Sequence, residues 1–157
     1  MKSQFLSHSP EETKKFAKEL TTKLLKKPFQ RKGALVLGLE GELGTGKTSF
    51  AQGFAKGLGV KEKILSPTFL IMRKLQIPKP KFQTNPKLAN FYHIDCYRIQ
   101  NSKELLALGW RKIVTNPQNI VLVEWADKVK TILPKDALGV TFSHAGKTKR
   151  TLSFVST

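Results

Sequence analysis

Cysteine and long apolar runs are scarce in this sequence. Cys96 is the only cysteine among 157 residues, so an internal disulfide cannot form, and no Cys/His cluster that would bind zinc surrounds it. No stretch approaches the roughly 20 apolar residues of a membrane-spanning helix, and the first residues lack the apolar core of a secretory signal. These absences argue against secreted, disulfide-stapled and membrane classes, and we expect a cytoplasmic protein without membrane contact.

Acidic residues are few as well: 11 Asp and Glu stand against 28 Lys and Arg, which gives a formal net charge of +17. Such a charge favours polyanionic partners, with nucleic acid ahead of anionic lipid, because every neutralised phosphate releases counterions. A lysine-rich surface that meets only water would give the same composition. Composition therefore leaves two interpretations open: a protein that works close to RNA, and one whose basic surface is merely solvated.

A chain of this length can bury about 70% of its unfolded surface in one core, and neither an internal repeat nor a domain boundary is visible in the sequence. We therefore expect residues 1–157 to form a single domain. Near its start, Ser9 is a typical helix N-cap and Glu12 stands where it would close a capping box, while Pro28 would stop a helix. Together with apolar residues at three- and four-residue spacing, these signals predict a helix over about residues 10–27.

An apolar run over residues 34–40, typical of a buried parallel strand, leads into a loop that fits the pattern G-x-x-x-x-G-K-[ST]. The loop consists of Gly41, Glu42, Leu43, Gly44, Thr45, Gly46, Lys47 and Thr48. Its glycines would let backbone N–H groups surround phosphate oxygens, and the next helix would add its positive N-terminal end. Lys47 would reach the β- and γ-phosphates, and the Thr48 hydroxyl would bind the Mg²⁺ ion that bridges them. The alternative is an ordinary strand-to-helix turn with three glycines, but the flanking strand and helix favour phosphate binding.

Two later strands are predicted to end in carboxylates. Residues 88–95 end at Asp95, and the apolar run 120–125 contains Glu124 after four aliphatic residues. Ligands of α/β proteins gather at the carboxyl ends of parallel strands. Glu124 is therefore a candidate Mg²⁺ ligand, and Asp95 is a candidate to orient or deprotonate an attacking water. The two roles could be exchanged, and an ion pair with Arg98 is the structural alternative for Asp95.

The remaining segments complete the expected fold. A proline before Thr68 keeps that residue on an extended segment, which suits either a switch-like loop or a plain turn into a strand over residues 69–73. Residues 74–87 are rich in lysine and proline and indicate a basic loop or hairpin insertion, and residues 137–143 and 150–155 alternate as hairpin strands do. These elements predict an α/β, three-layer P-loop NTPase-like domain with a mixed, mainly parallel central sheet and a C-terminal β-hairpin.

Several classes of protein share such a loop, which therefore identifies a nucleotide rather than a reaction. The sequence lacks the Asn/Thr-Lys-x-Asp segment with which a GTPase reads guanine. A small-molecule kinase usually carries arginines in a lid, whereas residues 74–87 contain none. We therefore expect ATP as the nucleotide and keep a P-loop kinase of a small metabolite or nucleoside as the second hypothesis.

Five motifs, in register over about residues 9–135, resemble the bacterial TsaE family. They are Gly41 to Thr48, Ser66 to Phe69, His93 to Arg98, Glu104-Leu105 with Gly109, and Val123-Glu124-Trp125. Glu42 and Ala126 depart from the family pattern, which often has Asp and Pro at these places. Both departures leave the phosphate-binding groups of the motif unchanged.

The resemblance implies a weak, partner-stimulated ATPase that assists formation of threonylcarbamoyladenosine at adenosine 37 of tRNA. It also implies a protein that is a monomer when isolated and acts through a TsaB–TsaD complex, in which TsaD performs the transfer and tRNA lies nearby. Position by position, it implies catalytic roles for Asp95, Lys47 and Thr68, ATP contacts from Thr13, Gly41 to Thr48 and Trp125, and Mg²⁺ ligation by Thr48 and Glu124.

The working hypothesis is Mg²⁺-dependent ATP hydrolysis in which protein groups position and neutralise the phosphates. Turnover by the isolated chain is expected to be slow because no arginine finger is evident beside the loop. His93 is expected to pack or hydrogen-bond locally, and Cys96 to be a core residue. A basic RNA-binding module that holds ATP as a structural ligand is the third hypothesis.

Overall fold

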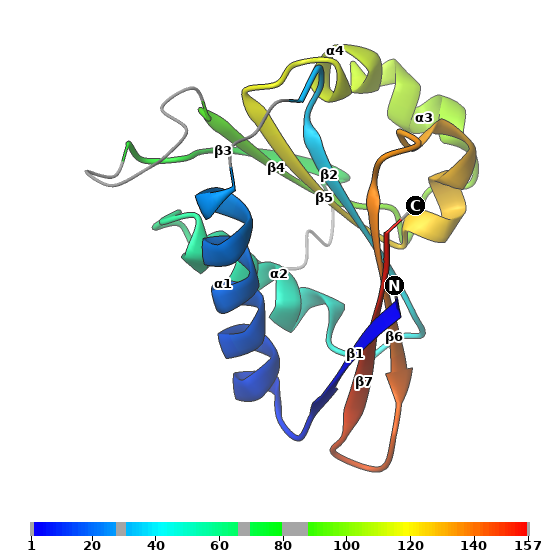
Figure 1. The fold of residues 1–157 in the computed structure, drawn as a ribbon. Coiled ribbons are helices and arrows are strands. Elements are labelled where there is room, and N and C mark those ends of the chain that lie inside the picture. The colour runs from blue at the N-terminus through cyan, green and yellow to red at the C-terminus, as the bar shows by residue number, and fades with distance from the viewer. Residues whose placement is uncertain (1, 28–30, 66–69, 80–87, 157) are drawn as a thin grey trace.

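The computed structural model describes residues 2–27, 31–65, 70–79 and 88–156. These residues form a seven-stranded sheet with helices on both faces (Figure 1). The elements in chain order are β1 (Lys2–Ser7), α1 (Pro10–Lys26), β2 (Leu35–Glu40), α2 (Lys47–Gly57), β3 (Met72–Gln76), β4 (Asn90–Asp95), α3 (Ser102–Ala107), α4 (Trp110–Val114), β5 (Asn119–Glu124), the 3₁₀ helix η1 (Ala126–Ile132), β6 (Leu138–His144) and β7 (Arg150–Ser156).

The sheet is mixed, as predicted, with the strand order β1-β7-β6-β2-β5-β4-β3. Its four central strands, β6, β2, β5 and β4, run parallel, whereas β1, β7 and β3 are antiparallel to their neighbours. Because β2, β4 and β5 point the same way, their carboxyl ends meet at one end of the sheet. Asp95 is there in register with Glu124, and the glycine-rich loop leaves β2 at the same end.

Helices cover both faces of the sheet and give the three layers that the sequence predicts (Figure 1). On one face, α1 and α2 pack around Leu37, Phe50 and Phe54. On the other, α3, α4 and η1 pack around Trp110 and Val121. β2 and β5 are covered on both faces, which explains why each one reads in the sequence as a continuous apolar run.

α1 lies unusually close to α2. A Cβ atom on Gly53 of α2 would stand 2.1 Å from the carbonyl oxygen of Lys14 in α1, so this approach requires glycine. Nearby, the buried Thr21 hydroxyl lies 2.8 Å from the carbonyl oxygen of Ala17 and 3.3 Å from that of Phe54. The contact fixes the position of α1 relative to the helix that follows the glycine-rich loop.

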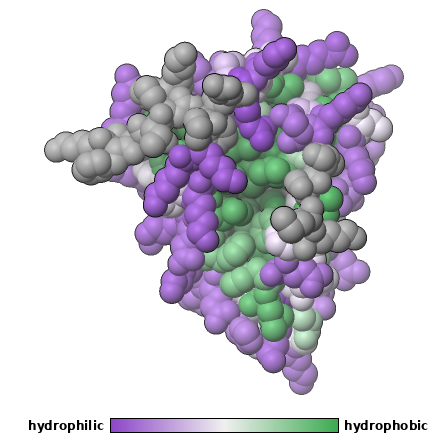
Figure 2. Space-filling view, in the orientation of Figure 1, coloured by the Kyte–Doolittle hydropathy of each residue, from purple (hydrophilic) through white to green (hydrophobic). Residues whose placement is uncertain are grey.

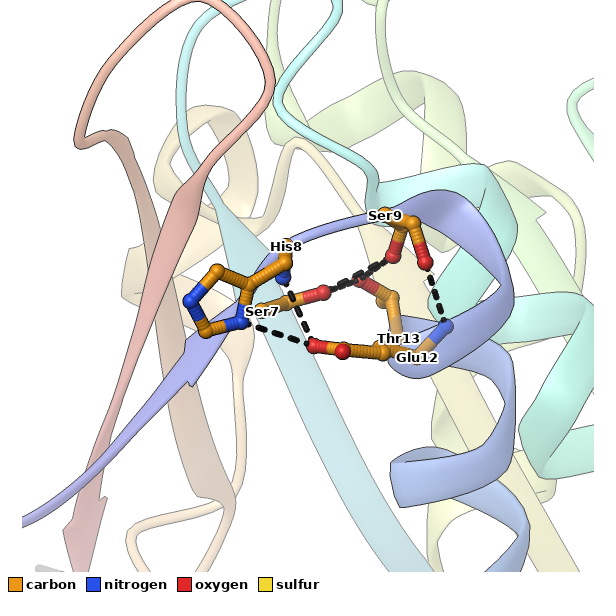
Figure 3. A network of polar contacts seen from close by, with 5 residues as sticks. All are labelled: Ser7, His8, Ser9, Glu12 and Thr13. Atoms are coloured by element: carbon orange, nitrogen blue, oxygen red, sulfur yellow. Dashed lines mark hydrogen bonds and ion pairs between the residues drawn. The ribbon is translucent and has the colours of Figure 1, made fainter.

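The start of α1 is as predicted, and its last residue, Lys26, precedes the predicted end by one. Ser9 is the N-cap, and its hydroxyl oxygen accepts a hydrogen bond of 3.1 Å from the N–H of Glu12. The Glu12 carboxylate accepts its hydrogen bond, 2.8 Å long, from the N–H of His8 (Figure 3). In the predicted capping box, the Glu12 carboxylate would accept from the N–H of the N-cap residue, Ser9. This part of the prediction is wrong: the carboxylate binds His8, the residue before the N-cap, whose ring adds a second hydrogen bond.

Two segments differ from the sequence predictions. Residues 2–7 form β1, which the sequence analysis missed because this short, largely polar strand finds its partner only in the distant β7. The strand predicted over residues 69–73 lies further along the chain, as β3 (Met72–Gln76), and therefore includes the start of the basic segment 74–87. It pairs antiparallel with β4. Residues 80–87 and Thr68 lie outside the described residues. The predicted C-terminal hairpin is confirmed as β6 and β7.

The face of the molecule seen in Figure 2 is mostly hydrophilic, with hydrophobic residues running down its middle. A groove of about 250 Å³ lies between α1 and the β6–β7 hairpin, and Phe16, Leu20, Leu138 and Phe154 are among its lining residues. No helix within the described ranges combines the length and the apolar composition that a bilayer crossing needs.

Candidate nucleotide-binding site

The glycine-rich loop, residues 41–48, connects β2 to α2. Gly41, Gly44 and Gly46 have φ angles of +147°, +75° and +99°, which side-chain-bearing residues adopt only with strain. A Cβ on Gly41 would in addition stand 2.6 Å from the carbonyl oxygen of Phe142 in β6. The glycines of the motif are thus required by the backbone itself.

α2 starts directly after this loop, with Gly46 as its N-cap and no side chain capping its first N–H groups. The helix has 11 residues and no acidic side chain in its first turn. Free N–H groups and the helix dipole make such a terminus attractive to an anion. The loop and the helix therefore have the geometry that the phosphate-binding motif predicts.

Lys47 is buried, with only 5% of its surface exposed. Its ammonium donates hydrogen bonds to the carbonyl oxygens of Gly41 and Glu42, at 2.5 and 2.8 Å, and lies 4.1 Å from the centre of the Trp125 ring. Burial lowers the pKa of the Lys47 ammonium, while the Glu124 carboxylate acts in the opposite direction. The charge is thus held inside the loop by neutral oxygens, an aromatic face and a nearby carboxylate.

Thr48, Glu124 and His93 form a chain of polar contacts beneath the loop. The Thr48 hydroxyl donates to Oε1 of Glu124 at 3.0 Å, and Oε2 of Glu124 lies 2.5 Å from Nε2 of His93. Glu124 and His93 are 2% and 1% exposed. His93 therefore fixes one carboxylate oxygen while the other faces the loop, and the expectation that His93 hydrogen-bonds locally is confirmed.

Asp95 lies on β4 beside Glu124 of β5 and is half-buried. Its Oδ1 accepts a hydrogen bond of 2.9 Å from the N–H of Tyr97. The neighbouring Cys96 is fully buried, as predicted, and burial raises the pKa of its thiol to about 12. No group of three or more His, Cys, Asp and Glu suited to a metal gathers among the residues that the structure describes.

A cavity of about 970 Å³ joins these elements, which is at the upper end of the usual range for ligand sites. The predicted site residues that line it are Thr13, Leu43, Gly44, Gly46, Lys47, Thr48, Asp95, Glu124 and Trp125. Thr45 is buried behind the loop, and the side chain of Glu42 is exposed. The structure thus brings together side chains from β4, β5, the loop and the start of α1, whereas Thr68 is not among the described residues.

Thr13 lines this cavity from the first turn of α1 and is 2% exposed. The Ser7 and Thr13 hydroxyls lie 2.7 Å apart (Figure 3), and both also reach the carbonyl oxygen of Ser9, at 2.8 Å from Ser7 and 3.4 Å from Thr13. The methyl group of Thr13 is the atom nearest to a Cβ built on Gly46, at 4.0 Å. Thr13 therefore turns its hydroxyl towards β1 and its methyl group towards the glycine-rich loop.

Trp125 follows β5 and has φ +58°, the one positive φ of a non-glycine residue in the described part of the chain. This left-handed conformation costs about 1–2 kcal/mol, and such strain is often found at functional sites. It brings the indole over the Lys47 ammonium and places its ring 5.1 Å from that of Tyr97. An aromatic wall therefore stands beside the loop, at the position that the family resemblance assigns to a nucleotide contact.

Arg150 is a site residue that the sequence analysis missed. Its Nε and Nη2 both donate to the carbonyl oxygen of Gly44, each at 3.2 Å, so an arginine does lie beside the loop, bound to its backbone. Arg150 is the first residue of β7, and the strand order places it between Ser7 of β1 and His144 of β6. Only that long-range pairing could have indicated the contact, since no local pattern links Arg150 to the loop.

Comparisons with known proteins identify the family of this chain and agree with its fold. The family model described as "Threonylcarbamoyl adenosine biosynthesis protein TsaE" matches residues 7–152. Two relatives named "tRNA threonylcarbamoyladenosine biosynthesis protein TsaE" are each 36% identical over 148 residues. The match with the relative from Bacillus subtilis (strain 168) covers 94% of this chain and 82% of that relative. The match with the relative from Rickettsia prowazekii (strain Madrid E) covers 93% of this chain and 90% of that relative.

The crystal structure of Bacillus subtilis YdiB is similar to this chain with a TM-score of 0.68 and 29% sequence identity. The match covers 99% of this chain and 86% of that one. The likeness therefore extends across the sheet and both helical layers. Because the family model and relatives of this identity span almost the whole sequence, the chain belongs to the TsaE family of tRNA threonylcarbamoyladenosine biosynthesis proteins.

Proposed function

We propose that this chain binds ATP with Mg²⁺ and hydrolyses it, slowly alone and faster on a TsaB–TsaD-type complex. In this role it assists threonylcarbamoylation of adenosine 37 in tRNA, while the transfer itself takes place on the partner. Family membership supports the pathway. The observation that carries the ATPase proposal is the convergence of the loop, Lys47 and the Thr48–Glu124 pair on one cavity.

The loop suits a triphosphate. The Lys47 ammonium is held by two neutral carbonyl oxygens, and an ionised phosphate oxygen is a stronger acceptor for an ammonium group than a carbonyl is. Lys47 would therefore exchange these bonds for phosphate oxygens, while the N–H groups at the start of α2 hold the same anion.

The donor set at Thr48 and Glu124 fits Mg²⁺. Mg²⁺ prefers oxygen ligands and is commonly bound by one or two protein groups together with substrate phosphates. The Thr48 hydroxyl and Oε1 of Glu124 are already neighbours at 3.0 Å, and His93 holds the other carboxylate oxygen in place. Bound Mg²⁺ would neutralise charge on the phosphates during transfer.

Asp95 is the candidate to orient the attacking water. It stands beside Glu124 at the end of the neighbouring strand and lines the same cavity. The N–H of Tyr97 holds its Oδ1, which restricts the carboxylate to a small set of orientations. A fixed carboxylate within the cavity can accept a proton or a hydrogen bond from water, as phosphoryl transfer to water requires.

Nucleotide binding is tested by calorimetry with Mg-ATP on matched variants. Lys47→Ala should weaken binding about 10-fold or more because a charge-assisted contact is lost, whereas Lys56→Ala, at an exposed position on the same helix, should bind normally. Glu124→Gln should weaken the dependence of binding on Mg²⁺, with the exposed Glu62→Gln as its control. Equal affinity of all four variants and the native protein would contradict the proposed site.

The pathway role is tested by reconstitution of tRNA modification with TsaB and TsaD, with and without this chain and ATP. Modification should require both, and phosphate release should rise when the partners are added. Modification that does not depend on this chain would refute the role. Radiolabel transferred from ATP to a small acceptor would instead support a kinase, and RNA binding that is unaffected by nucleotide and by Lys47→Ala would support an RNA-binding module.

A further inference from the structure

Arg150 connects the glycine-rich loop, residues 41–48, to the β6–β7 hairpin. While Nε and Nη2 reach the Gly44 carbonyl oxygen, Nη1 donates to the carbonyl oxygen of Lys149 at 2.9 Å and to that of Gly146 at 3.3 Å. The hairpin turn is itself closed by a bond of 2.9 Å from Ala145 N–H to the Lys149 carbonyl oxygen. One half-buried guanidinium therefore binds the turn of the hairpin and the middle of the loop at the same time.

Gly44 has little else to hold it. It is exposed, its φ is +75°, and no heavy atom would lie within 4 Å of a Cβ at this position. Glycine has the widest conformational freedom of all residues, so a loop peptide in such surroundings rotates easily. A planar guanidinium that directs two N–H groups at one carbonyl oxygen restricts this rotation, and the compact ammonium of lysine cannot reproduce the fork.

The orientation of this peptide decides where the next N–H group points. In a trans peptide the C=O and N–H bonds point in opposite directions, so a Gly44 carbonyl turned to Arg150 keeps the Thr45 N–H turned away from the guanidinium. In a phosphate-binding loop, such N–H groups are the ligands of the phosphate oxygens.

We propose that Arg150 is a positioning residue for nucleotide binding, which holds the Gly44–Thr45 peptide in the orientation that leaves the Thr45 N–H for a phosphate oxygen. This role rests on the proposed nucleotide function and extends it. Because Arg150 acts through the loop backbone, it strengthens the binding of ATP and of ADP equally.

The test compares three variants with the native protein. Arg150→Lys keeps the charge without the fork, Arg150→Gln removes the charge, and Lys149→Gln removes a charge from the adjacent, exposed residue. The first readout, ¹⁵N relaxation of the nucleotide-free protein, gives the order parameters of the Gly44 and Thr45 N–H groups. We expect about 0.85 for the native protein and Lys149→Gln, and below about 0.6 for both Arg150 variants, while the N–H groups of β2 and β5 in the same spectra stay rigid and verify the fold.

The second readout is the dissociation constant of Mg-ATP and of Mg-ADP. Both should rise about 10-fold in Arg150→Lys and in Arg150→Gln, as expected for a lost charge-assisted hydrogen bond, and should stay within about twofold in Lys149→Gln. The proposal is overturned if Arg150→Lys keeps native order parameters and affinities, or if only ATP binding suffers, which would place Arg150 on the γ-phosphate. The relaxation measurement needs no nucleotide, so it still decides the role of Arg150 in the loop if the native protein binds no ATP.

Discussion

Replacing Gly53 by alanine should destabilise the protein, although alanine is the better helix residue. In an exposed helix interior the change would stabilise by about 1 kcal/mol. Here the added Cβ would stand 2.1 Å from the Lys14 carbonyl oxygen and 2.6 Å from the Lys14 Cα, and backbone atoms cannot rotate away as a side chain can. Overpacking costs about 1–3 kcal/mol and sometimes more, and this contact belongs at the upper end because α1 has to move as a whole. We expect a net loss of about 2 kcal/mol, which lowers the melting temperature by about 4–8 °C.

Urea unfolding and thermal melting measure this effect, with Gly139→Ala as the control. Gly139 lies in β6, where the nearest atom to an added Cβ is 3.7 Å away, so alanine fits without displacement. Since α1 carries Thr13 next to the loop, a shifted α1 should also weaken Mg-ATP binding at temperatures where Gly53→Ala is still folded. A Gly53→Ala protein as stable as the native one, or more stable, would refute the reasoning that the interhelical contact outweighs helix propensity.

Three further predictions concern single residues. Asp95→Asn should lower partner-stimulated ATP hydrolysis about 100-fold or more, as expected for a group that positions or deprotonates water, with Mg-ATP affinity nearly unchanged in calorimetry; full hydrolysis would remove Asp95 from the mechanism. Ser7→Ala should lower the free energy of unfolding by about 0.5–1.5 kcal/mol because it removes the buried hydrogen bond between the Ser7 and Thr13 hydroxyls and leaves Thr13 only its longer contact with the Ser9 carbonyl oxygen, whereas the exposed Ser3→Ala should change it little; urea titration of both decides. Because burial raises the pKa of the Cys96 thiol to about 12, the thiolate is scarce at neutral pH, and alkylation of the native protein should be at least about 100-fold slower than in urea; equal rates would contradict this.

The loop and its flanking elements are predictable from sequence because their signals are local. A continuous apolar run gives β2, the spacing of glycines gives the loop, and a change to helical periodicity gives α2. The carboxylates Asp95 and Glu124 follow from the rule that ligands gather at the carboxyl ends of parallel strands, and the register confirms that they are neighbours. The positions implied by the family resemblance, Thr13 and Trp125, also line the cavity, and their contacts with a nucleotide stay predictions.

The sequence by itself thus determined the class of domain, the glycine-rich loop and the identity of most side chains that line the cavity beside it. Only the tertiary structure decided how these side chains are held: His93 on one oxygen of Glu124, and Thr13 with its hydroxyl towards β1. The same holds for Arg150, which lies 106 positions after Gly44 in the chain and yet binds its carbonyl oxygen. The physical reason is that such contacts depend on which strands become neighbours, and β1 and β7 gain their places from pairing across the whole sheet, whereas local periodicity encodes only the conformation of each segment.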